Sequence, residues 1–164
     1  MLSLRRLRPG DSDRGSIALW VIMLTFSVLV LVALIVDGGQ LMNAKERAAD
    51  MAEQAARAAA NDVNVASLRA GKVTINPDAC VNPGGPAASL VASYGKGIGV
   101  TAVIPASGCL TGTKMTALGL QHFATVTVDV STVPIIPIGI FGSYQVPAQA
   151  TAFLQCGINQ GVAC

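Results

Sequence analysis

Residues 17–36 are twenty consecutive positions without a charged side chain, IALWVIMLTFSVLVLVALIV, and this run constrains the fold more than any other feature of the chain. As an α-helix at about 1.5 Å per residue it is about 30 Å long, which matches the hydrocarbon core of a bilayer. Fourteen of its residues are Leu, Ile, Val or Phe, and each favours insertion by about 0.3–0.6 kcal/mol. The sequence therefore predicts a single-pass transmembrane helix at residues 17–36.

A cleavable secretory signal is the alternative interpretation of this run. The apolar region of a signal peptide is about 7–15 residues long and ends in a small-residue cleavage motif, whereas this run is longer and ends in Asp37-Gly38-Gly39. We therefore expect it to be retained as an anchor. Four arginines precede it within the leader, residues 1–16, and the first basic residue after it is Lys45. The positive-inside rule places this leader in the cytoplasm and residues 37 onward outside the cell membrane.

The net charge of +2 gives no support to nucleic-acid binding. Beyond residue 36 seven basic residues are balanced by seven acidic ones, so the basic excess lies in the leader, where topology explains it. Catalytic chemistry is equally unsupported, because His122 is the single histidine and no G-x-S-x-G motif is present. Gly71-Lys72 lacks the glycine spacing of a phosphate-binding loop. The sequence predicts no enzyme, no cofactor, no metal and no small-molecule substrate.

All four cysteines lie beyond the apolar run, in the part expected to be exported, which is an oxidising environment. An even number of cysteines there favours two disulfides over free thiols, and four cysteines allow three connectivities. The most local pairing is Cys80 with Cys109 and Cys156 with Cys164, and we favour it. A zinc site is the other interpretation, but the chain has no C-x-x-C motif.

The helical pattern continues past the apolar run through residues 37–63, a stretch rich in alanine. Apolar residues recur there at steps of three and four, which is the spacing of one helix face. The members of this predicted packing face are Leu41, Ala44, Ala48, Met51, Ala52, Ala55 and Ala59. The face either packs on the chain's own C-terminal domain or contacts other long helices in a filament or membrane assembly, and a protruding helix can do both.

Residues 64–164 are predicted to form an exported β-rich domain, because the helical period fades and turn residues appear. Alternation of apolar and polar residues predicts strands at 123–131 and 146–155, with Pro147 suited to an edge or a strand start. A further strand is expected within 100–104 and a short helix within 87–94. The apolar segment 133–142 contains two prolines, so it is either core beneath the sheet or an exposed patch that contacts lipid or a partner. The predicted fold class is α+β, a long N-terminal helix followed by a small, mainly antiparallel sheet in a pilin-like architecture.

Three pieces in this order resemble a known family: Arg14-Gly15-Ser16 before the span, Asp37-Gly38 after it, and the alanine-rich stretch 48–60. They are similar to the TadE/TadG-like proteins, which assist assembly of Flp-type (tight adherence) pili, and residues 126–152 are similar to the C-terminal segment of such proteins. The resemblance implies a membrane-anchored accessory protein that acts by packing and scaffolding. Its partners would be other pilus-assembly membrane proteins or pseudopilins.

The resemblance also raises the question of processing after Gly15, before Ser16. Pilin-like members carry a Glu five residues after this glycine, and the corresponding residue here is Trp20, in a span without any acid. The departure favours the uncleaved, anchored kind over a processed minor pseudopilin. A membrane-tethered extracellular binding or cell-envelope module is the alternative function, with the helix as a stalk.

Overall fold

The computed structural model describes residues 13–80, 83–117, 119–133 and 143–154, with the side chains described from residue 17 onward. The helices are α1 (Asp13–Asn61), α2 (Val65–Arg69), the 3-10 helix η1 (Pro77–Cys80) and α3 (Pro86–Gly97). The strands are β1 (Thr101–Val103), β2 (Cys109–Thr116), β3 (Gly119–Thr132) and β4 (Tyr144–Phe153). The chain forms two compact units, residues 1–39 and residues 40–164, and we call the second unit the head.

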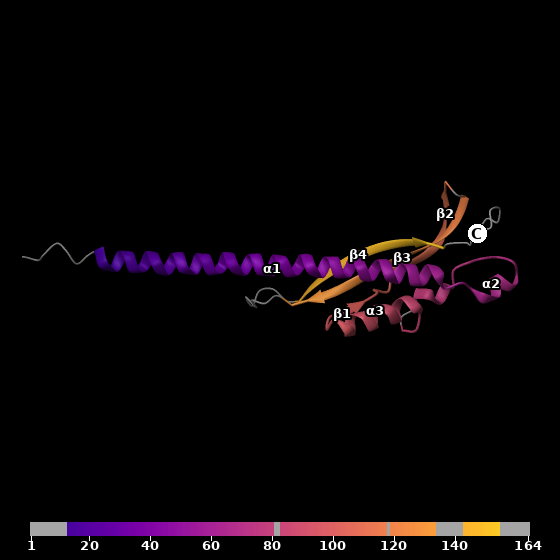
Figure 1. The fold of residues 1–164 in the computed structure, drawn as a ribbon, viewed down its shortest axis with the longest axis horizontal. Helices are drawn as coiled ribbons and strands as arrows, with labels where there is room; N and C mark the ends of the chain where they lie inside the picture. The colour runs from indigo at the N-terminus through magenta and orange to yellow at the C-terminus, as the bar shows by residue number, and fades with distance from the viewer. Residues whose placement is uncertain (1–12, 81–82, 118, 134–142, 155–164) are drawn as a thin grey trace, which may run out of the picture. The chain divides into compact units, whose positions relative to one another are not determined.

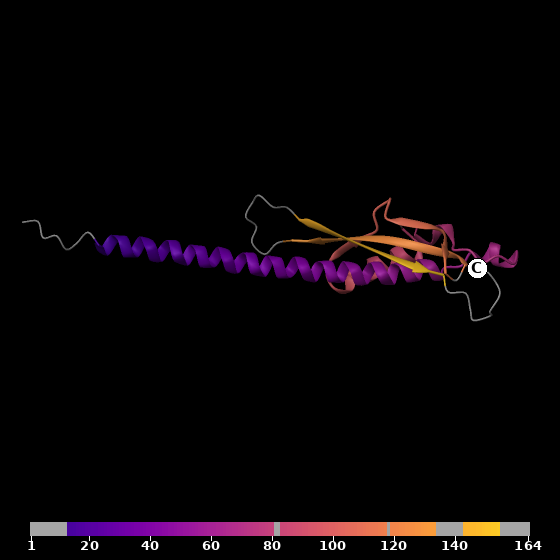
Figure 2. The same ribbon diagram turned by 90° about the horizontal axis from the view of Figure 1, so that it is seen from above.

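The head contains one antiparallel sheet in which β3 is the central strand. β4 pairs with β3 along its whole length, from Thr132↔Tyr144 to Phe123↔Phe153. β2 pairs with the first half of β3. β1 pairs with β3 near the C-terminal end of β3, where Thr101 of β1 lies opposite Ser131. Figures 1 and 2 show the head's part of α1 lying along β3 and β4 as a layer on one face of this sheet. The predicted fold class, a long helix followed by a small antiparallel sheet, is confirmed.

The core of the head joins one face of α1 to one face of β3. The alternating residues of β3 that the sequence predicted to be buried, Ala124, Val126, Val128 and Val130, are at most 1% exposed. They belong to the same buried cluster as the alanines of α1 and as Val91 of α3. Because strand side chains alternate between two faces, the threonines between these residues face away from α1. The helical pattern of α1, with period 3.6, and the alternating pattern of β3, with period 2, therefore contribute to the same core.

α3 approaches the neighbouring elements so closely that two of its positions require glycine. At Gly85, the residue that caps its N-terminus, a Cβ atom would lie 2.6 Å from the carbonyl oxygens of Asp78 and Ala79. At Gly95 a Cβ atom would lie 2.9 Å from the carbonyl oxygen of Val100. Only a residue without a Cβ allows this contact between backbones.

Three elements of the head, α2, η1 and β2, were not predicted from the sequence. β2 shows only weak alternation, with Lys114 and Met115 adjacent and Gly112 at its centre. It extends beyond the core, and five of its eight residues are exposed. Its pairing with β3 therefore depends on the backbone ladder more than on burial. Segment 133–142 is described only at Val133, which is 71% exposed, and both interpretations of the rest of it lie outside the described residues.

The short helix α2 depends on Asn64, whose side-chain oxygen accepts hydrogen bonds from the backbone N–H groups of Ala66 (2.9 Å) and Ser67 (3.2 Å). Replacing an N-cap asparagine by alanine leaves these donors without a partner and costs about 0.5–2 kcal/mol. We expect Asn64→Ala to lower the free energy of unfolding by this amount in denaturant titrations. Asn64→Asp keeps the acceptor and should be nearly neutral. An equal loss in both variants would contradict the role of the cap.

Candidate functional site: an apolar anchor and the helix that carries the head

The first unit presents an apolar surface with no covering. Every large apolar side chain from Ile17 to Val36 is between 43% and 73% exposed. Within the described part of the chain, α1 is the one helix long and apolar enough to cross a membrane. Leaving so much apolar area in water costs about 25 cal/mol per Å², and lipid removes that cost. The stretch is the candidate membrane span.

The two hydroxyl groups inside the span are satisfied within the helix itself. Thr25 donates to the carbonyl oxygen of Val21 at 2.8 Å, and Ser27 donates to that of Met23 at 2.8 Å. Such bonds to the preceding turn allow hydroxyl side chains to enter lipid without a partner helix. Gly15 and Ser16 lie in the first turn of α1, and Trp20 is 72% exposed within the same helix.

The packing face of α1 is occupied by the head. Six of its seven predicted members are buried, and Leu41 is 46% exposed. Sequence reasoning missed two further buried residues, Ala56 and Ala60. The signal for them was present as adjacent pairs, 51–52, 55–56 and 59–60, which widen the stripe beyond one residue per turn. Because this face is covered by the head's own core, a partner must contact some other surface of the head.

The opposite face of α1 is polar and exposed. Glu53 and Arg57 form an ion pair there, with the acid on the N-terminal side at the i, i+4 spacing that stabilises helices. Both side chains are more than half exposed, so the pair contributes at most a few tenths of a kcal/mol. This polar face of the helix is exposed to solvent.

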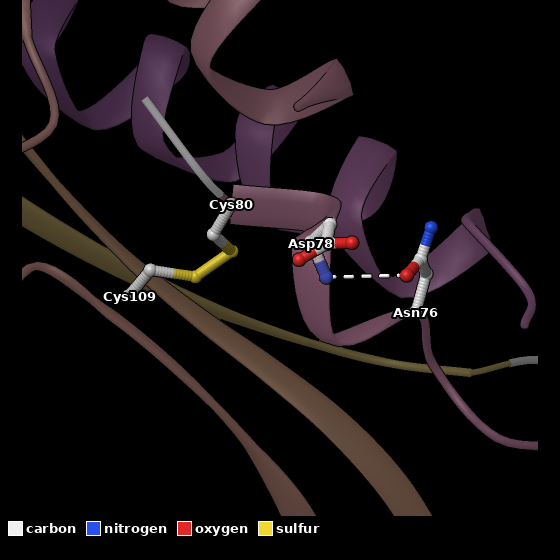
Figure 3. The surroundings of a disulfide bond; sticks show 4 residues. All are labelled: Asn76, Asp78, Cys80 and Cys109. Carbon is white, nitrogen blue, oxygen red and sulfur yellow. Dashed lines mark hydrogen bonds between the residues drawn. A yellow bond between two sulfur atoms is a disulfide. The ribbon is translucent and has the colours of Figure 1, made fainter. Parts of the chain in front are cut away.

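A disulfide joins η1 to the start of β2. Figure 3 shows Cys80 and Cys109 bonded, and their Cα atoms are 6.0 Å apart. Beside it the backbone N–H of Asp78 donates to the side-chain oxygen of Asn76 at 3.1 Å, which shapes the turn into η1. The favoured pairing is therefore present for Cys80 and Cys109. The second predicted pair, Cys156 with Cys164, lies outside the described residues.

A shallow hollow next to this disulfide has a volume of about 480 Å³. It is lined by Pro77, Cys80, Ile104, Pro105, Ala106, Cys109 and Thr111. These residues provide one hydroxyl group, that of Thr111, and no charged side chain.

The residues considered for chemistry are not brought together. His122 is half-buried on β3, and its carbonyl oxygen accepts a hydrogen bond from the N–H of Leu154 at 2.8 Å as part of the sheet. In residues 13–80, 83–117, 119–133 and 143–154, no group of three or more His, Cys, Asp or Glu side chains could hold a metal ion.

Comparison with known proteins gives one match, and it falls on the helix described above. No curated protein and no solved structure matches the chain. The match extends from Gly15 through the candidate span and the alanine-rich face to Asp62, and β1–β4 lie outside it. The resemblance predicted from the sequence is thus confirmed for residues 15–62, which match the model of the family Tad, described as putative Flp pilus-assembly TadE/G-like.

Proposed function

We propose that the chain is a membrane-anchored accessory protein for the assembly of a tight-adherence (Flp-type) pilus or a related secretion system, acting by packing and scaffolding. The observation that carries this proposal is the family match over residues 15–62. The matched residues include the apolar span and the alanine face that holds the head. A role in pilus assembly accounts for the apolar span in the first half of α1 and for the alanine face in its second half.

The proposed topology has residues 1–16 in the cytoplasm, residues 17–36 in the membrane and residues 37–164 outside. The excess of arginine before the span supports this orientation. The disulfide between Cys80 and Cys109 agrees with it, because disulfides persist in oxidising compartments and are rare in the cytoplasm.

Scaffolding by this chain would use surfaces other than the alanine face. That face is covered by the head, so pseudopilins or assembly-platform proteins would contact the span, the polar face of α1 or the exposed parts of the sheet. The head would then present its sheet to partners outside the membrane.

Deleting the gene tests the function. In the source organism we expect the deletion strain to carry several-fold fewer tight-adherence filaments by electron microscopy, while the major pilin is still made and processed. The full chain supplied in trans should restore the filaments. A version with two lysines in the span, Leu29→Lys with Val32→Lys, should fail, because each lysine costs about 2.5–3.5 kcal/mol at the centre of a span. Filament numbers unchanged by the deletion would refute the proposal.

Processing is tested separately by intact mass and N-terminal sequencing of the protein recovered from native membranes. We expect the sequence to begin ahead of Gly15, since Trp20 stands where pilin-like members carry an acid. A mature N-terminus at Ser16 would instead identify a processed minor pseudopilin that is built into the filament.

A further inference from the structure

Among the described residues, the pairing of the strands leaves the outer edge of β4 without a partner. Both β4 and β2 are opposite Thr125 of β3, and both β4 and β1 are opposite Ser131. A strand has only two edges, so β1 and β2 share one edge of β3 and β4 occupies the other. In the described part of the chain no strand pairs with the outer side of β4. Figure 1 shows β4 as the long, unbroken strand on its side of the sheet.

Two backbone hydrogen bonds define which groups of β4 point outward. The N–H of Leu154 donates to the carbonyl oxygen of His122 at 2.8 Å, toward β3. The N–H of Thr127 donates to the carbonyl oxygen of Gly108, on the side of β3 away from β4. Bonded and non-bonded pairs alternate along an antiparallel ladder. The even-numbered residues of β4 therefore bond to β3, and its odd-numbered residues direct their N–H and C=O groups outward.

This outer edge has little protection against another strand. Natural edge strands are usually blunted by charges, prolines, bulges or short length. β4 is ten residues long and carries no charged side chain. Its one protective residue is Pro147, which lies at an outward position. Beyond it the N–H groups of Gln149, Thr151 and Phe153 face outward and have no backbone partner among the described residues.

We propose that the outer edge of β4, residues 148–153, accepts an extended, uncharged segment of another exported protein as an additional strand of the sheet. Strand addition obtains affinity from main-chain hydrogen bonds and specificity from alternate side chains. The absence of charge on β4 favours an uncharged segment, because a charged one would lose hydration without gaining an opposite charge. The partner's place in pilus assembly rests on the proposed function, whereas the binding mode rests on the sheet alone.

The two faces of β4 define the pattern of the incoming segment. Ala148, Ala150 and Ala152 are half-buried on the side of α1, and Gln149 and Thr151 are exposed on the open side. A segment that continues this sheet would alternate apolar residues toward α1 with polar residues toward solvent. β3 has this alternation, and it already occupies the inner edge of β4.

A second copy of the chain fits this edge poorly. Antiparallel pairing of β4 with β4 relates the two heads by a two-fold axis perpendicular to the sheet. In each head β4 runs in the same direction as the head's part of α1 (Figures 1 and 2), so these parts of the two α1 helices would run antiparallel to each other. Parallel, in-register pairing of two β4 strands requires outward backbone groups from odd-numbered residues of one strand and from even-numbered residues of the other. In both copies, however, the outward groups belong to odd-numbered residues. A different protein meets neither restriction.

The test uses the full chain in phospholipid nanodiscs and a peptide with the sequence of residues 123–128, FATVTV, acetylated and amidated. Hydrogen exchange is followed at single amides. We expect the amides of Gln149, Thr151 and Phe153 to exchange about tenfold more slowly when the edge is about nine-tenths occupied. The even-numbered amides of β4, already bonded to β3, should change little.

Matched variants at Thr151 separate the backbone from the side chain. Thr151→Pro removes the outward N–H, at a position equivalent to that of Pro147, and should abolish protection by the peptide. Thr151→Ala loses the side-chain hydrogen bond between Thr151 and Thr125 (2.8 Å) but keeps the N–H, so it should still bind. If Thr151→Pro lowers the unfolding temperature, Thr151→Lys is used in its place. The lysine adds a charge to the edge of β4 without changing the backbone and should likewise abolish protection by the peptide.

Three results would overturn the proposal. The first is absence of protection at about 1 mM peptide, which corresponds to binding weaker than about 4 kcal/mol. The second is protection at the β1–β2 edge instead. The third is protection of Gln149, Thr151 and Phe153 without peptide together with a doubled mass, which would identify a second copy as the occupant. None of these results would alter the filament counts that test the proposed function, so the two failures are distinguishable.

Discussion

Replacing Cys80 and Cys109 together by serine is expected to lower the free energy of unfolding of the head by about 3–4 kcal/mol. The bond spans 29 residues of sequence, and closing a loop of this length removes about 12 cal/mol/K of entropy from the unfolded chain in the chain-entropy relation. At room temperature this corresponds to about 3.6 kcal/mol, a large part of the stability of a domain of this size.

Denaturant titration of the full chain in nanodiscs, read out by circular dichroism, measures this effect. Adding reductant to the wild type should lower its free energy of unfolding by a similar amount, because reduction opens the same loop. The native state should still form at low denaturant, since Cys80 and Cys109 are only partly buried against the alanine and valine core of α1 and β3. A loss below about 1 kcal/mol would mean that the unfolded chain is already compact around the two cysteines.

Replacing Ala55 by leucine is expected to destabilise the head by about 1–3 kcal/mol or more. Ala55 is fully buried within the core cluster, so the added carbon atoms must displace neighbours or force strained rotamers. Leucine is nearly as good a helix former as alanine, which means that helix propensity contributes little to the loss. The result would show that the small side chains of this face are required by packing.

Gln54→Leu is the matched control, because Gln54 is the preceding residue of the same helix and is exposed. Its effect should remain within about 0.5 kcal/mol. The two variants are compared by thermal and denaturant unfolding in nanodiscs. Equal effects, or a stabilising Ala55→Leu, would show that the packing face has room to spare. The face would then have room for contact with a second helix.

The stability of the head matters for the proposed function because its support and its core share the same residues. Residues 44–60 of α1 belong to the helix that carries the head and also supply eight buried residues to its core. A variant that loosens this face is therefore expected to impair filament assembly in proportion to its loss of stability. Thr151→Pro, or Thr151→Lys where the proline lowers the unfolding temperature, is expected to impair assembly by blocking the outer edge of β4.

The sequence by itself determined the elements whose pattern repeats over many residues. The helical spacing of the alanines and the period-two alternation of β3 each reflect burial of one face, whereas the twenty residues of the span are apolar on every side of the helix. Each pattern is recorded in the type of residue at every position. For the same reason α1, β3 and β4 were found close to their true bounds. Their order also carried the resemblance that the family match confirms for residues 15–62.

Only the tertiary structure decided which segments meet. β2 was not predicted because most of its residues are exposed, and its place in the sheet comes from backbone bonds to β3 that any residue can make. The pairing of Cys80 with Cys109, one of three possible connectivities, depends on η1 and the start of β2 lying side by side. The free edge of β4 is likewise a property of pairing, because a strand's period shows which side chains are buried but not which neighbour its backbone groups bond.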